Sequence, residues 1–180
     1  MNIFGHEYGF MLTVGASEEI SELCPDGDLS RLGEALEGSY SKTIGTVVKM
    51  ILSMSRAYDL ARAFEGHPVD HPGLTAEMLK ALPQSKFLAV QNEAMAAFRG
   101  DTKTTVEVEP SKKKGQRRGI DLNLAWFLFY GRMLNMTKQE IMVTRYGEMS
   151  DMISCFAIYK GAEPKKKRKA FTFDEALALR

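Results

Sequence analysis

The feature that most constrains the fold is a long stretch of helical hydrophobic periodicity between residues 39 and 65. Apolar side chains recur there every three or four residues, at Ile44, Val47, Val48, Ile51, Met54, Tyr58 and Ala61. This spacing predicts one amphipathic helix, which ends where Gly66 and Pro68 interrupt the pattern. Met50, Leu52 and Leu60 widen the apolar surface beyond a single stripe. We therefore expect a central helix with neighbours on more than one side, in a mainly α fold.

The rest of residues 1–100 predicts a small N-terminal β-hairpin and several shorter helices. Apolar residues alternate after Gly5, as in a half-buried strand, at Tyr8, Phe10, Leu12 and Val14. Gly15 ends this strand, and Ser17 is the predicted N-cap of the helix that follows. Thr75 is the predicted N-cap of a later helix, and Pro83 suits the first turn of the next one. Together these elements predict a bundle-like N-terminal helical domain.

The composition changes between residues 101 and 119, where large apolar side chains are almost absent. Such a segment buries too little apolar surface to offset the entropy that it loses on ordering. We predict a flexible linker there, although residues 104–108 alternate as a short strand would. A basic tail occupies residues 162–180. The net charge of +1 predicts no overall attraction to nucleic acid or membrane.

Residues 120–161 predict a small helical C-terminal domain. Its first helix has hardly any polar face around Trp126, so its own domain or another chain has to cover it. Thr137 and Glu140 fit a capping box, and Gly161 ends the last helix. We predict partner-binding residues here, at Trp126, Phe127, Phe129, Tyr130, Met133, Met149, Met152 and Phe156. The alternative is that the methionines fill an irregular core, as methionines at helical spacing usually do.

No catalytic or cofactor-binding motif is evident in the sequence. His67 and His71 stand four residues apart, but Pro68 and Pro72 exclude the helix that would bring them onto one metal ion. The stretch "GSYSKTIG", residues 38–45, contains the residue types of a phosphate-binding loop in the wrong order. We therefore expect a non-enzymatic protein without a metal or cofactor.

Cysteine usage and hydropathy predict a protein of a reducing, aqueous compartment. Cys24 and Cys155 form no disulfide framework, so we expect reduced thiols. The longest strongly apolar run, residues 124–130, is far shorter than the ~20 residues of a membrane-spanning helix. The run "PKKKRK", residues 164–169, resembles a nuclear-import pattern, but such runs are usually solvated. We expect no sequence-specific nucleic-acid binding, whereas weak, salt-sensitive binding to phosphates stays open.

Two blocks of the chain resemble tail assembly chaperones of long-tailed bacteriophages and related prophages. The first is "NIFGHEYGFMLTVGASEEISELCPDGDLSRLGEAL", residues 2–36, and the second is "IDLNLAWFLFYGRMLNMTKQEIMVTRYGEMSDMISCFAIYKG", residues 120–161. The resemblance implies an assembly factor that coats the tape measure protein and is displaced as tail tube subunits arrive. It also implies self-association, a place in the bacterial host cytoplasm, and absence from the mature particle.

This family commonly makes a short and a long product from one message by a −1 ribosomal frameshift. Lys112, Lys113, Lys114 and Gly115 lie at the boundary between the two parts of the chain, where an A-rich slippery codon run is expected. We expect the chain to be the long product, and the alternative is an ordinary lysine-rich linker. A slippery heptamer at codons 111–115, with a stop codon shortly downstream in the original frame, distinguishes the two.

Two further interpretations stay open at this point. One is a small adaptor that binds nucleic acid or protein through the basic segments, and the other is a minor structural protein of the tail. A metal-dependent enzyme is a more distant alternative, because the chain offers no suitable set of ligands.

Overall fold

The computed structural model describes residues 1–37, 39–109 and 123–165. It confirms a mainly helical fold with a small antiparallel hairpin at the N-terminus. Strand β1 (Asn2–Ile3) pairs with β2 (His6–Glu7), so that Asn2 lies opposite Glu7. The turn between the strands takes positive φ angles at Phe4 and Gly5, and the Asn2 side chain accepts a hydrogen bond from the Gly5 amide.

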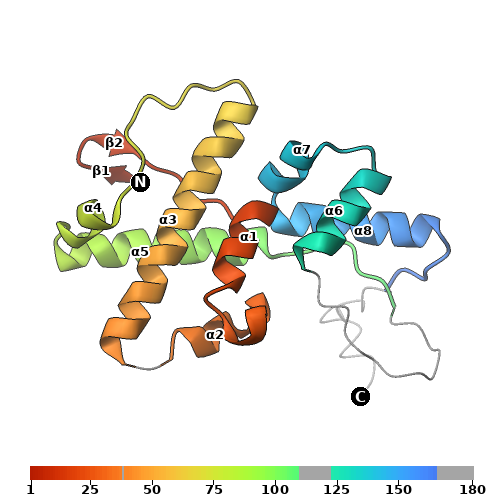
Figure 1. Ribbon diagram of the computed structural model, residues 1–180, viewed down its shortest axis with the longest axis horizontal. Coiled ribbons are helices and arrows are strands. Elements are labelled where there is room, and N and C mark those ends of the chain that lie inside the picture. The colour runs from red at the N-terminus through yellow and green to blue at the C-terminus, as the bar shows by residue number, and fades with distance from the viewer. Residues whose placement is uncertain (38, 110–122, 166–180) are drawn as a thin grey trace, which may run out of the picture.

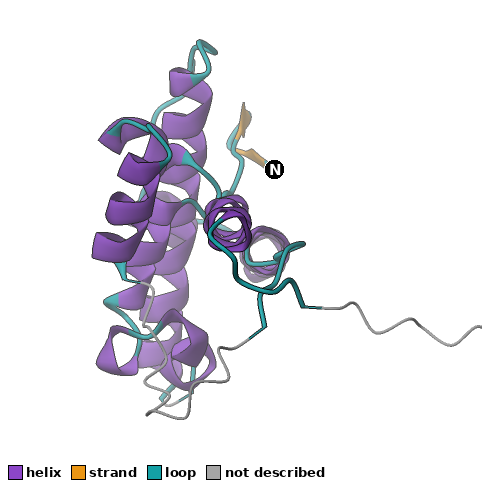
Figure 2. Cartoon of the chain, turned by 90° about the vertical axis from the view of Figure 1, so that its right-hand side faces the viewer, coloured by secondary structure: helices purple, strands orange, loops and turns teal. Residues whose placement is uncertain are grey.

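The helices follow in the order α1 (Val14–Ser21), the 3-10 turns η1 (Pro25–Gly27) and η2 (Leu29–Arg31), α2 (Leu32–Ala35), α3 (Tyr40–Phe64), α4 (Ala76–Lys80), α5 (Gln84–Asp101), α6 (Leu124–Met133), α7 (Lys138–Val143) and α8 (Tyr146–Tyr159). Figure 1 shows α5 and α8 along the length of the molecule, with α3, α1 and α6 crossing them. Figure 2 shows the molecule from the side. The crossing helices α3, α1 and α6 form one layer there, and α5 and α8 are seen along their axes beside it.

Helix α3 forms the centre of the larger hydrophobic core, as its periodicity predicts. Its buried residues include Met50, Ile51 and Met54, which have no measurable exposure. They pack in one cluster with Ile20 of α1 and Val90 of α5. Burying a side chain of this size contributes about 1.5–3 kcal/mol, so this helix anchors the N-terminal part of the fold.

The segment after the hairpin is buried but does not form the predicted strand. Tyr8, Phe10 and Leu12 alternate into the core as expected, but residues 8–12 pair with no strand in the described part of the chain. Val14 begins α1, and the prediction that Ser17 caps this helix is wrong. Thr13 is the N-cap, and its side-chain oxygen accepts from the Ala16 amide at 3.2 Å.

Helices α6, α7 and α8 pack around a second core and dock on α1. Phe127, Ile141 and Met149 are buried together with Val14 of α1. Two backbone hydrogen bonds join the parts directly: the Val14 amide donates to the Thr144 carbonyl, and the Tyr146 amide donates to the Leu12 carbonyl, each at 2.9 Å. The two predicted helical parts therefore share a packed interface along α1.

Residues 103–109, the described end of the predicted linker, lie along α8. The amides of Thr105 and Val106 each donate to the Asp151 carboxylate at 2.9 Å. The Glu109 amide donates to the Glu163 carbonyl at 2.8 Å, and Lys165 pairs with Glu107. These contacts tie the segment to the last described helix.

Candidate protein-interaction surface

Aromatic side chains gather on the surface formed by α6 and α8. Trp126 stacks on Tyr130 with 5.7 Å between ring centroids and meets Phe129 edge-on at 6.0 Å. Tyr130 meets Phe156 of α8 at 6.2 Å, which joins the two helices. We call these side chains, with two neighbours at helical spacing, the aromatic patch: Trp126, Phe129, Tyr130, Met133, Phe156 and Tyr159.

The aromatic patch brings several exposed apolar side chains together on two neighbouring helices. Phe129 and Met133 are each 53% exposed, and Tyr159 is 81% exposed. Trp126, Tyr130 and Phe156 are half-buried. Single exposed apolar residues are ordinary, but a contiguous group of this kind typically marks a surface that another molecule covers.

The opposite side of α6 explains why these rings point outward. Asn123 caps the helix, and Phe127 and Gly131 face the second core. A Cβ at Gly131 would overlap the Ile141 side chain, so only glycine allows α6 and α7 to approach so closely. Because α6 is apolar on nearly every side, the face that does not pack inward is left on the surface.

The structure divides the predicted partner-binding residues into two groups. Phe127 and Met149 are at most 1% exposed and belong to the second core, against which Met152 also packs. The other five predicted residues lie in the aromatic patch, and one of them, Tyr130, also packs against the second core. Tyr159 was missed, although it follows Phe156 by three residues and the helical spacing alone could have indicated it. Lys112, Lys113, Lys114 and Gly115 lie outside the described residues.

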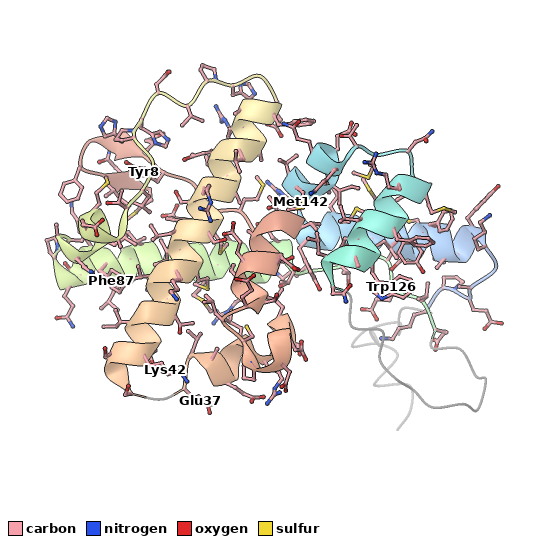
Figure 3. All side chains as sticks on the ribbon, in the orientation of Figure 1. Tyr8, Glu37, Lys42, Phe87, Trp126 and Met142 are labelled. Carbon is pink, nitrogen blue, oxygen red and sulfur yellow. The ribbon has the colours of Figure 1, made fainter. Side chains whose placement is uncertain are left out.

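Positive charge borders the aromatic patch on both helices. Lys160 Nζ lies 5.5 Å from the ring centroids of both Phe156 and Tyr159, which is cation–π geometry. On α6, the exposed Arg132 follows Phe129 by three residues, and its Nη1 atom is 3.5 Å from the Met136 carbonyl oxygen. Figure 3 shows Trp126 on α6, far from Phe87 on α5.

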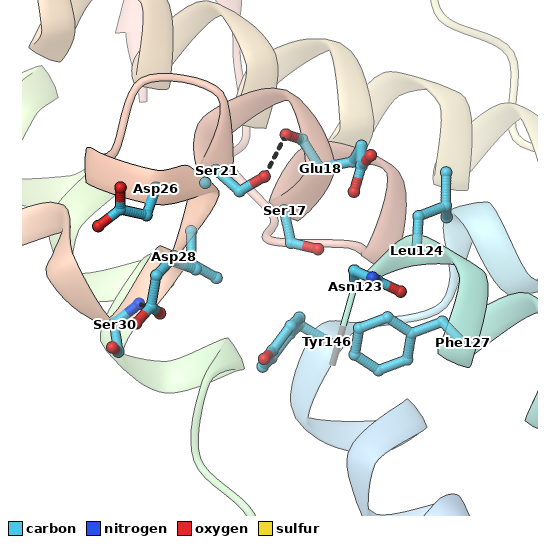
Figure 4. A pocket seen from close by; sticks show the side chains of 12 residues that line it. Ser17, Glu18, Ser21, Asp26, Asp28, Ser30, Asn123, Leu124, Phe127 and Tyr146 are labelled. Atoms are coloured by element: carbon cyan, nitrogen blue, oxygen red, sulfur yellow. Dashed lines mark hydrogen bonds between the residues drawn. The ribbon is translucent and has the colours of Figure 1, made fainter. Parts of the chain in front are cut away.

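A polar cavity of about 470 Å³ lies where α1 and η2 face α6 and α8. Its lining includes Glu18, Asp26 and Asp28, seen in Figure 4. Two of these carboxylates are already engaged, because Asp26 pairs with Arg31 and Asp28 accepts from the Ser30 amide at 2.8 Å. The hydrogen bonds from Ser30, with the nearby Arg31, hold the pKa of Asp28 below its ordinary value despite some desolvation.

A second groove, of about 420 Å³, is mostly apolar and lies between α2 and α5. Leu32 and Leu36 line it from one element, Met95 and Phe98 line it from α5, and Tyr146 of α8 also contributes to the lining. It adds apolar surface on the N-terminal part of the chain, away from the aromatic patch.

His71 lies against the half-buried carboxylate of Asp59 in the N-terminal part. Its Nε2 atom is 3.6 Å from Asp59 Oδ1, and its ring contacts Tyr8 with 4.6 Å between centroids. Burial raises the pKa of Asp59, and the nearby His71 opposes this rise. The Tyr8 hydroxyl donates to the Pro72 carbonyl at 2.9 Å, so this group fastens the loop after α3. In the described ranges, no three histidine, cysteine or acidic side chains gather as metal ligands would.

Comparison of the chain with protein-family models, curated proteins and solved structures found no match. Of the helices in the described ranges, none is both long enough and apolar enough to span a membrane.

Proposed function

We propose that the protein is a non-enzymatic tail assembly chaperone of a bacteriophage or prophage. In this role it binds the tape measure protein in the host cytoplasm, keeps it soluble, and helps to recruit tail tube subunits. The observation that carries the proposal is the aromatic patch on α6 and α8. It lies within residues 120–161, one of the two blocks that resemble this family.

The chemistry of the patch supports a role in binding other polypeptides. Aromatic side chains and methionines bury large areas at low entropic cost, and methionine adapts to irregular partner surfaces. Three residues of the patch are at least 53% exposed: Phe129, Met133 and Tyr159. Phe127 fills the inward side of the same helix, and of the patch residues only Tyr130 also packs against the second core.

The test is co-expression with the tape measure protein that the same genome encodes. We expect the full chain to raise the soluble fraction of that protein and to co-purify with it. Phe129→Ala is expected to weaken the complex by about 2 kcal/mol, about 30-fold in affinity, as truncation of an aromatic anchor does.

Phe64→Ala is the matched control. Phe64 is a helical phenylalanine with a similar exposure of 46%, but it lies at the end of α3. We expect this variant to bind as the natural chain does, and both variants to unfold at nearly the natural temperature. A complex that fails to form, or that is weakened equally by both substitutions, contradicts the proposal.

A further inference from the structure

We infer that the aromatic patch binds an amphipathic helix whose apolar stripe is flanked by acidic side chains. The inference rests on the proposed function and specifies the chemistry of the segment that this surface recognises. It is drawn from the spacing of the rings and from the charges that border them.

The spacing of the patch suits a helix as its partner. Trp126, Phe129, Tyr130 and Met133 stand at positions i, i+3, i+4 and i+7 of α6, which form one ridge. Phe156 and Tyr159 stand three apart on α8 and form a second ridge, joined to the first by the Tyr130–Phe156 contact. A helix with an apolar row of its own can pack across these two rows of side chains.

The charges around the patch favour acidic flanks on that helix. Arg132 is the one charged residue in the sequence of α6, LAWFLFYGRM. In α8 the acidic residues Glu148 and Asp151 precede the patch, and the Asp151 carboxylate is occupied by Thr105 and Val106. At the end of α8 that carries the rings, Lys160 directly follows Tyr159, and the next acidic residue, Glu163, comes three residues further on, after the helix has ended.

These features also favour such a helix over two other occupants. A second copy of the chain, placed by a two-fold axis, would bring equivalent Arg132 and Lys160 charges towards each other. Nucleic-acid bases stack on open ring faces. In the patch Tyr130 stacks on Trp126, and Lys160 lies over Phe156 and Tyr159.

Trp126 provides the measurement, because it is the only tryptophan of the chain and belongs to the patch. Two tryptophan-free helical peptides of about 20 residues, roughly 30 Å long, carry the same leucine stripe with either glutamate or lysine flanks. Each is titrated into the full chain while Trp126 emission is followed. We expect the glutamate peptide to shift the emission and to bind about tenfold more tightly, with the preference falling as salt is added.

The double variant Arg132→Gln/Lys160→Gln should lose most of this preference. Lys80→Gln/Lys86→Gln removes two exposed positive charges from α4 and α5 and should retain it. Equal or tighter binding of the lysine peptide, or no binding of either, overturns the inference. So does displacement of the glutamate peptide by a single-stranded oligonucleotide, or a concentration-dependent dimer that alone accounts for the Trp126 signal.

The two proposals fail in distinguishable ways. If the tape measure protein is solubilised in a manner that depends on Phe129 but the peptides are bound equally, only the inference about acidic flanks is wrong. If the tape measure protein gains no solubility and forms no complex, the proposed function itself is wrong, whatever the peptides do.

Discussion

At the scale of single residues, close approach between the two parts of the chain depends on Gly147. This residue lies in the first turn of α8, beside the backbone that follows α5. A Cβ there would overlap the Lys103 carbonyl oxygen and lie 2.7 Å from that of Asp101. Backbone atoms cannot turn aside as the end of a flexible side chain can, so only glycine fits here without a shift of the helix.

We expect Gly147→Ala to destabilise the protein by about 2 kcal/mol, because overpacking outweighs the better helix propensity of alanine. Gly45→Ala is the control, since Gly45 is also helical but a Cβ there meets open space. That substitution should stabilise the protein by about 0.5–1 kcal/mol. Urea unfolding of both variants gives the two values. Stabilisation by both substitutions would mean that α8 does not lie this close to residues 101–103.

At the scale of elements, Asp151 attaches the segment after α5 to α8. Its carboxylate accepts hydrogen bonds from the Thr105 amide and hydroxyl and from the Val106 amide. Burial acts to raise the pKa of Asp151, but these hydrogen bonds outweigh it and leave the pKa below its ordinary value. The folded protein therefore favours the ionised form, and the carboxylate stabilises the attachment at neutral pH.

Asp151→Asn should loosen this attachment by about 1 kcal/mol, because an amide accepts weaker hydrogen bonds than a carboxylate. Amide hydrogen exchange at Thr105 and Val106 should then be about fivefold faster at neutral pH. Because the pKa is lowered on folding, the stabilisation is present above the unfolded pKa and disappears as pH falls through the folded value. The difference between the two proteins should thus vanish in acid.

Glu148→Gln on the same helix is the control for this experiment, since residue 148 is exposed and lies one turn away. It should leave exchange at Thr105 and Val106 unchanged. If both substitutions accelerate amide exchange equally, the loss of any negative charge on α8 is enough to loosen the attachment. The hydrogen bonds of Asp151 are then not the cause.

At the scale of the whole molecule, α1 belongs to both cores. Ala16 and Ile20 pack in the larger core, whereas Val14 packs in the second. Asp101 at the end of α5 strengthens the junction, because its carboxylate accepts from the Leu12 amide at 2.8 Å and lies 3.8 Å from Arg145 Nε. A helix shared in this way should make the two cores unfold together.

We therefore expect one cooperative transition, with Trp126 fluorescence and far-UV circular dichroism giving the same urea midpoint. Leu79→Ala, a cavity in the larger core far from Trp126 in the sequence, should lower the stability reported by Trp126 by about 3 kcal/mol. If the Trp126 transition keeps its midpoint in this variant, the C-terminal helices unfold independently of the larger core.

The elements predicted correctly from sequence are those with strong local determinants. The long periodic stretch became α3, and Thr75 caps α4 as predicted. The capping box of α7 is present in full, with the Thr137 amide 2.5 Å from a Glu140 oxygen. The start of α1 was missed because Gly15 reads as a strand end, whereas a Cβ there would lie only 3.1 Å from Met142, over a hundred residues away in sequence.

The sequence by itself determined where most of the helices lie and that α6 would be apolar on nearly every side. It could not determine which of the α6 rings would be buried, because a helix without a polar face carries no signal of its orientation. Packing decided this: Gly131 admits Ile141, which places Phe127 in the core and leaves Phe129 outside. The aromatic patch is therefore decided by tertiary structure, because packing against one side of α6 determines which of its side chains stay exposed.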